Sequence, residues 1–86
     1  MANRKRVIAI YEKALRKPAS LKFREACVLA EGVGFRLDRI RGSHHIFVHH
    51  SQSNCLINLQ EVRGDAKPYQ VRQLLKLIEE FQLLPQ

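Results

Sequence analysis

The spacing of apolar residues predicts two helices in the first third of the chain. Apolar side chains recur every three or four residues from about residue 4 to residue 17, which is typical of an amphipathic helix. Asn3 can cap this helix and Pro18 stops it. The same spacing predicts a shorter helix over about residues 22–32, opened by Ser20.

Three runs with strand character follow. Residues 35–41 alternate apolar and charged side chains, residues 44–50 are rich in β-branched and aromatic side chains, and residues 55–62 alternate again. The pair Gly42-Ser43 is short enough to turn a hairpin, and a polar stretch predicts another turn before the third run. Consecutive strands joined by short turns predict a three-stranded antiparallel sheet.

The chain closes with a predicted helix over about residues 68–82, after a polar loop at residues 63–66. Pro68 suits the first turn of this helix, and apolar residues continue at helical spacing. The order of elements predicts an α+β fold of two layers, in which helices cover one face of the sheet. From about residue 20 onward, the α-β-β-β-α order is that of a double-stranded-RNA-binding fold, preceded here by an extra N-terminal helix.

Length and composition allow one domain over residues 1–86, which we divide into an N-terminal helical extension (1–18) and a core (19–86). A hydrophobic fraction of 45% is too high for a disordered tail. No window reaches the roughly 18 apolar residues of a membrane span, and the basic N-terminus lacks the apolar stretch of a signal peptide. We therefore expect a cytoplasmic protein. Cys27 and Cys55 are too few for a disulfide framework and are expected to be small buried hydrophobes.

The net charge of +7 is concentrated at one end of the chain. Residues 1–24 hold eight Lys and Arg but only one acidic residue, whereas residues 25–86 hold seven of each sign. A concentrated positive charge favours a polyanionic or acidic partner, of which nucleic acid is the commonest. A solvated helix face that only aids solubility is the alternative.

Four histidines in residues 44–50 raise the question of a metal site. Residues of a strand advance about 3.3 Å each and alternate between faces. His44 and His50 therefore lie on one face, roughly 20 Å apart, and His45 and His49 lie on the other face, about 13 Å apart. Neither pair can bind one ion at ligand distances near about 2 Å, so no metal site is predicted.

Acid–base catalysis is the other chemistry that these histidines offer. Histidine exchanges a proton near neutral pH, and RNA carries its own nucleophile, the 2′-hydroxyl. One histidine with nearby cations can therefore cleave RNA, and Arg36, Arg39 and Arg41 lie just before the turn. Half-exposed strand histidines without a role remain the alternative.

Two motifs resemble the HicA mRNA interferase family. Gly34-Phe35 is followed by Arg39 and then by the run Arg41-Gly42-Ser43-His44-His45-Ile46-Phe47. Asn58-Leu59-Gln60, followed by the run from Ala66-Lys67-Pro68-Tyr69 to Leu74, is similar to the C-terminal half of one HicA-like branch. The resemblance runs from about residue 21 to residue 80.

This resemblance implies a toxin of a type II toxin–antitoxin system with a double-stranded-RNA-binding-like fold. It implies ribosome-independent cleavage of mRNA, and neutralisation by a HicB-type antitoxin in a hetero-oligomer. Because the 2′-hydroxyl chemistry needs no metal ion and no metal site is predicted, we expect cleavage without a metal or cofactor. The catalytic histidine of the family maps to His44, and Arg39, Arg41, Ser43 and Lys67 are candidates for RNA binding. Two departures are visible: the helix at 4–17 is an addition, and Leu59-Gln60 stands where many members carry Pro-x-His.

Two other functions are compatible with the sequence. A non-catalytic RNA-binding module of the same fold is the first. The second is a DNA-binding or interaction protein, which needs an exposed recognition helix. The last helix offers Gln70, Arg72, Gln73 and Lys76, but its many apolar residues are those of a core helix.

Overall fold

The order of elements agrees with the sequence pattern. A computed structural model describes residues 3–52 and 54–85. In chain order the elements are α1 (Arg4–Arg16), a 3-10 helix (Pro18–Ser20), α2 (Phe23–Gly32), β1 (Phe35–Arg41), β2 (His44–His49), β3 (Leu56–Val62), β4 (Asp65–Ala66) and α3 (Pro68–Phe81). The α+β class and the three predicted helices are confirmed.

The sheet has four strands in the order β1-β2-β3-β4, each antiparallel to its neighbour. The prediction of three strands misses the two-residue β4, which lies in the segment predicted as a polar loop. The reason is the turn between β3 and β4, in which Arg63 (φ 54°) and Gly64 (φ 86°) both have left-handed backbone. Two such residues make the type I′ turn that folds one strand directly back on another.

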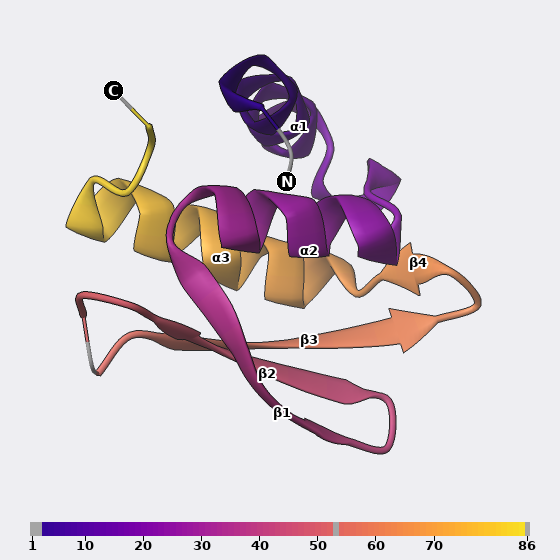
Figure 1. The fold of residues 1–86 in the computed structure, drawn as a ribbon. Helices are drawn as coiled ribbons and strands as arrows, with labels where there is room; N and C mark the ends of the chain where they lie inside the picture. The colour runs from indigo at the N-terminus through magenta and orange to yellow at the C-terminus, as the bar shows by residue number, and fades with distance from the viewer. Residues whose placement is uncertain (1–2, 53, 86) are drawn as a thin grey trace.

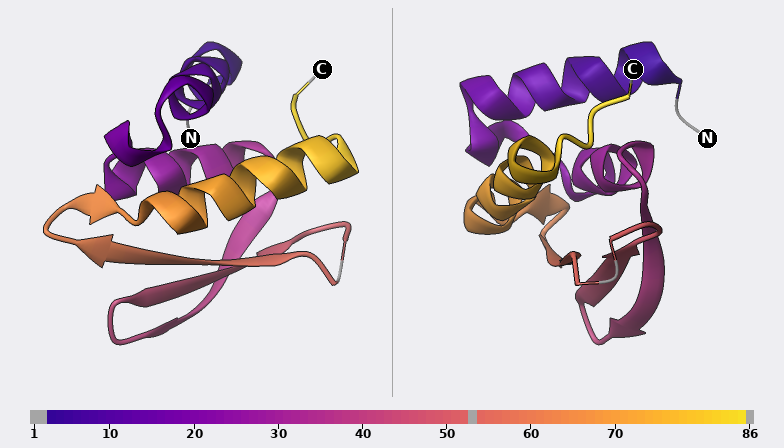
Figure 2. Two further views of the ribbon diagram at one scale, coloured as in Figure 1. Left: turned by 180° about the vertical axis from the view of Figure 1, so that it is seen from behind. Right: turned by 90° about the vertical axis from the view of Figure 1, so that its left-hand side faces the viewer.

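The helices lie on one side of the sheet (Figure 1). α2 and α3 cover one face, and α1 crosses them on their far side, so that α1 adds a third layer to the predicted two (Figure 2). The core fills the space between these layers, with Leu29, Leu59 and Leu74 fully buried. Within the described residues, no helix has the length and hydrophobicity needed to cross a membrane.

α1 is held to the rest of the molecule by close packing. Its Val7, Ile10 and Ala14 are buried. A Cβ atom on Gly32 of α2 would lie 2.4 Å from Cγ2 of Val7, so only glycine lets the two helices approach this closely. The added helix therefore shares its core with the rest of the chain.

Local hydrogen bonds set the helix starts. The side chain of Asn3 accepts a hydrogen bond from the Arg6 N–H at 2.8 Å, which confirms the predicted cap. Ser20, in contrast, does not open α2, because it closes the preceding 3-10 turn. α2 begins at Phe23. The Glu25 carboxylate accepts a hydrogen bond from the backbone N–H of Lys22, the residue before the helix.

Candidate functional site

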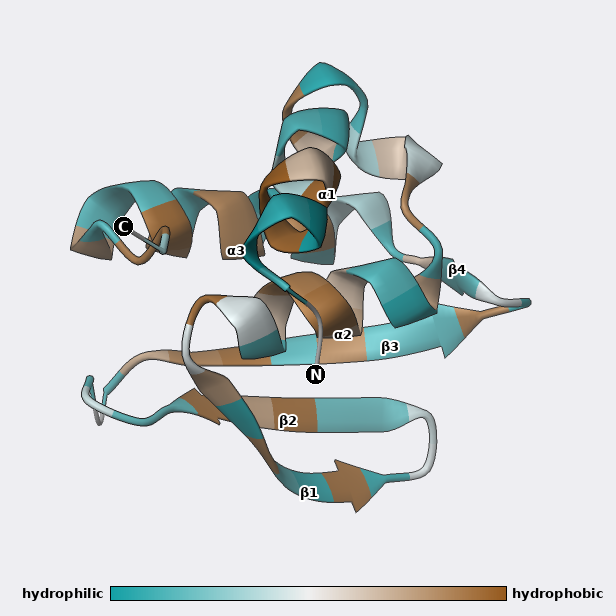
Figure 3. Cartoon of the chain, turned by 45° about the horizontal axis from the view of Figure 1, so that its top comes forward, coloured by the Kyte–Doolittle hydropathy of each residue, from teal (hydrophilic) through white to brown (hydrophobic). Residues whose placement is uncertain are grey.

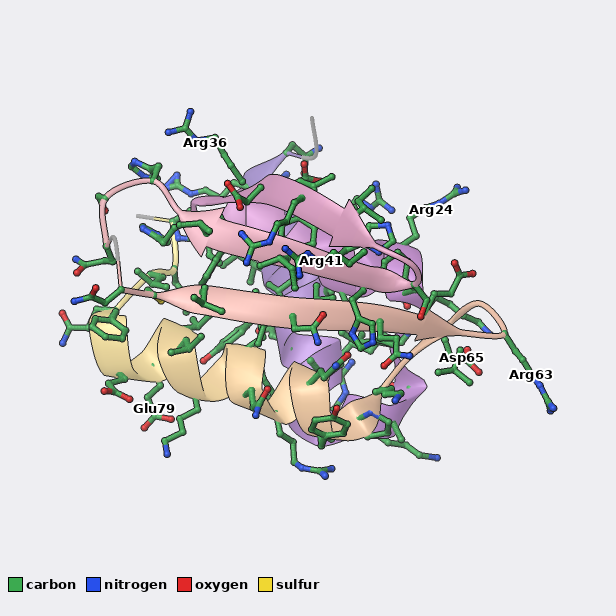
Figure 4. The ribbon with its side chains drawn as sticks, turned by 90° about the horizontal axis from the view of Figure 1, so that it is seen from below. Arg24, Arg36, Arg41, Arg63, Asp65 and Glu79 are labelled. Atoms are coloured by element: carbon green, nitrogen blue, oxygen red, sulfur yellow. The ribbon has the colours of Figure 1, made fainter. Side chains whose placement is uncertain are left out.

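The β1–β2 hairpin places His44 on the sheet face that the helices leave uncovered. Phe47 of β2 is buried beneath the helices, so His44, three residues earlier, points the other way. Gly42, with φ 60°, allows the two-residue turn that precedes it. We call this uncovered side the open face, and Figure 4 looks onto it. It carries Arg36, Arg39, Arg41, His44, Ile46, Val48, Leu56, Asn58 and Gln60.

A β-bulge in β1 brings two arginines to the open face. Leu37 pairs with Phe47 on the helix side, whereas Arg39 pairs with Ile46 on the open face, so Asp38 is an extra residue in β1. Without this residue, strict alternation would place Arg39 and Arg41 on the side of Leu37. With it, Arg41 lies directly across from His44, and its side chain lies over the strands in Figure 4.

Two amide side chains of β3 contact the turn and His44. The Asn58 side-chain nitrogen lies 2.9 Å from Nδ1 of His44, and the Gln60 amide donates to Oγ of Ser43 at 3.1 Å. His44 is half-buried. Neither amide was predicted from the sequence to belong to the site. The alternation of residues 55–62 could have indicated them, because the antiparallel pairing of β2 and β3 brings alternate residues of both strands to one face.

Lys67 reaches the site only through other residues. The buried Gln70 side chain accepts the Gln60 N–H at 2.7 Å and donates to the Tyr69 hydroxyl at 3.3 Å. The Lys67 ammonium lies 5.9 Å from the centre of the Tyr69 ring. Lys67 is thus beside an exposed aromatic ring rather than beside His44. The buried Gln70 is also unavailable to read a DNA base.

The positive charges of the chain are divided between two sides of the molecule. On the open face, Arg39 forms an ion pair with Asp38, whereas Arg41 forms no ion pair within residues 3–52 and 54–85. The basic residues of α1 lie beyond α2 and α3, away from the open face (Figure 1). The structure thus places the basic residues of α1, which belong to the segment expected to attract a polyanionic partner (residues 1–24), away from His44. The end of that segment lies beside the hairpin, where Phe23 contacts His45.

The other three histidines have different surroundings. His45 points to the helix side, where its ring meets the edge of Phe23 with centroids 4.8 Å apart. His49 is 5% exposed, and its Nε2 lies 2.9 Å from the carbonyl oxygen of Val33. Its Nδ1 accepts the N–H of Ser51. His50 is exposed and stacks on His49. The predicted separation of His44 and His45 to opposite faces is confirmed.

Neither cysteine offers a nucleophile. Burial, and to a lesser extent nearby acidic residues, raises the pKa of Cys27 to about 12 and also raises the pKa of the Cys55 thiol. Both thiols are therefore protonated at neutral pH. Cys55 is buried as predicted, and Cys27 is partly buried against the core. In the part of the chain that the structure describes, no group of three or more His, Cys, Asp or Glu side chains is arranged to hold a metal ion.

The site therefore consists of one imidazole held by an amide on an open strand surface, with a guanidinium on the adjacent strand. Figure 3 shows that the end of β2 next to this hairpin turn is hydrophilic, whereas the middle of the strand is hydrophobic. This arrangement suits an extended, charged ligand better than a small apolar one.

Comparison with known proteins identifies the family. A family model described as the HicA toxin of bacterial toxin–antitoxin systems matches residues 23–79, about two thirds of the chain. The chain belongs to the HicA toxin family. The match confirms the resemblance seen in the sequence, and it begins after α1. HicA membership implies an antitoxin as the partner. No curated protein and no solved structure matched the chain.

Proposed function

We propose that this HicA toxin is an endoribonuclease that cleaves mRNA, with His44 as its catalytic residue. The observation that carries the proposal is the position of His44 on the open face, half-buried and with its Nδ1 bound by Asn58. All four histidines lie within the residues that the family model matches, and among them His44 is on the uncovered sheet face directly opposite a cation, Arg41.

In this proposal, His44 acts as the general base. Its unprotonated ring nitrogen takes the proton of a 2′-hydroxyl, and the 2′-oxygen then attacks the adjacent phosphorus. The bond to the 5′-oxygen breaks, and that oxygen takes up a proton from solvent. The products are a 2′,3′-cyclic phosphate and a 5′-hydroxyl, and no metal ion is required.

The remaining site residues would bind the RNA. Arg41 is the stronger candidate for a phosphate contact, because the charge of Arg39 is partly compensated by Asp38. Ser43 presents its hydroxyl at the turn next to His44, and Lys67 with Tyr69 extends the surface beyond β3. We further propose that a HicB-type antitoxin binds the toxin in the cytoplasm and forms a hetero-oligomer with it.

The test is cleavage of a 5′-labelled single-stranded RNA by the purified chain, made by cell-free synthesis to avoid toxicity. We expect fragments that end in a 2′,3′-cyclic phosphate, formed equally well with and without EDTA. Loss of cleavage in EDTA with rescue by a divalent ion would contradict the mechanism. Binding of the RNA without new ends would instead support the alternative, a non-catalytic RNA-binding module of the same fold.

A further inference from the structure

The contact between Asn58 and His44 has an unusual feature on the Asn58 side. The Asn58 nitrogen donates to Nδ1 of His44, while the oxygen of the same amide is buried and has no hydrogen-bond partner among the described residues. A buried acceptor without a donor is destabilising, because it has lost its hydrogen bond to water and gained none in return. The arrangement is therefore unfavourable for Asn58 alone.

The two ends of an amide favour different forms of the imidazole. When the amide nitrogen donates to Nδ1, the neutral ring carries its proton on Nε2 and has no free lone pair to act as a base. When the amide is turned by half a turn, its oxygen accepts a hydrogen bond from Nδ1–H, and the lone pair of Nε2 is free. The second arrangement also supplies the missing donor for the Asn58 oxygen, and it moves the amide nitrogen to the place that the oxygen now occupies.

Asn58 is well placed to hold the ring in this way. Its neighbours Ile57 and Leu59 are 2% and 0% exposed, and β3 is paired to β2 on one side, so the backbone at Asn58 is fixed by packing. Nε2 of His44 has no hydrogen-bond partner within the described residues. The charged group nearest in the strand pairing is Arg41, opposite His44 on β1.

We propose that Asn58 is a positioning residue for His44. In the reactive state its side-chain oxygen accepts the Nδ1–H of His44, which leaves Nε2 as the atom that takes the proton from RNA. The same oxygen then stabilises the imidazolium that forms, because both ring nitrogens carry hydrogen at that point. This inference rests on the proposed function and adds to it the group that selects the form of the base.

The experiment compares Asn58→Ala and Asn58→Asp with the wild-type chain and with Asn54→Ala, a control in an exposed turn. We expect kcat for cleavage of the labelled RNA to fall about 100-fold in Asn58→Ala with little change in KM, since a misplaced base slows the chemical step. In Asn58→Asp, the negative charge favours the protonated ring, so the acid limb of the pH–rate profile moves to higher pH. Cleavage by Asn54→Ala remains at the wild-type rate.

A second measurement does not depend on how the variants fold. In wild-type protein with ¹⁵N-labelled histidine, NMR at high pH reports which ring nitrogen of His44 carries the proton. Protonation at Nδ1 supports the proposal, and protonation at Nε2 overturns it. Wild-type kcat in Asn58→Ala, together with an inactive His44→Ala, would also overturn it while leaving the proposed function intact. Full activity in His44→Ala would instead overturn the proposed function.

Discussion

His44 and His49 lie in the same strand, β2, but on opposite faces of the sheet, and their surroundings differ. On the side covered by α2 and α3, His49 is buried and hydrogen-bonded to Val33 and Ser51. On the open face, His44 is half-buried and held by one amide. A histidine thus stabilises the fold on one face, whereas a histidine on the other face is a candidate base. Strand alternation, rather than residue type, decides which histidine can meet a ligand.

The largest expected effect is on the open face. We expect His44→Ala to lower the cleavage rate by about 10² to 10⁴, because a general base is lost, and to let cells that express the protein grow. His45→Ala, one residue along but on the other face, should keep most of the activity. Growth after induction and RNA cleavage measure the effect, and a thermal melt of each variant checks the fold. Equal losses of cleavage activity in the two variants, with unchanged melts, would contradict the assignment of the base to the open face.

The next effect concerns the covered face. We expect His49→Ala to lower the free energy of unfolding by about 3 kcal/mol, since it leaves a cavity and deprives the Val33 carbonyl of its partner. The exposed His50 serves as the control, with a loss of less than about 1 kcal/mol in His50→Ala. Urea denaturation gives both values. A stable His49→Ala variant with impaired cleavage would show that His49 acts in the site.

Replacing the arginine opposite His44 should have a smaller effect, on RNA binding rather than on the chemical step. Arg41→Ala should raise KM for RNA about 3- to 10-fold and reduce the slope of log affinity against log salt by about 0.7, the loss of one phosphate contact to a single strand. Arg16→Ala, on α1 at the far side of the molecule, should change neither quantity. If both variants weaken binding equally, the RNA path extends beyond the open face to α1.

The smallest effect tests the helix side without touching the open face. Burial opposes ionisation of Glu25, but the Lys22 N–H and the Lys13 ammonium outweigh it and hold the pKa of this carboxyl below its usual value of 4.5. Its contribution to stability is therefore present above that pH and is lost as the pH falls through the lowered pKa. We expect Glu25→Gln to cost about 1 kcal/mol at neutral pH and to approach the wild type in acid. Cleavage well below the melting temperature should not change.

The sequence predicted local features well, because each had a local cause. Asn3 caps α1, Pro18 ends it, and the Gly42-Ser43 turn follows from the residues themselves. β4 was missed because a two-residue strand has no periodicity, although Arg63-Gly64 occupies the turn that creates it. The third layer was missed because periodicity shows that a helix has an apolar face but not which surface covers it.

The candidate site was predicted less completely than the fold. The motif selects His44 as the candidate base, which stays a prediction, and strand alternation correctly places His44 and His45 on opposite faces. The contact with Asn58 depends on the register between β2 and β3, and the position of Arg41 depends on the bulge at Asp38. Register and bulges are set by packing across the whole sheet, so they are not apparent from any single segment.

The bulge at Asp38 also affects how the molecule meets its own copies. β1 is the longer of the two edge strands of the sheet, and a regular edge strand offers a row of free N–H and C=O groups to which another chain can add. The extra residue interrupts that row in the middle of β1, and the charged side chains around it hinder a second strand from aligning there. The irregularity that directs Arg41 toward His44 thus also protects a small protein with an uncovered sheet from edge-to-edge aggregation.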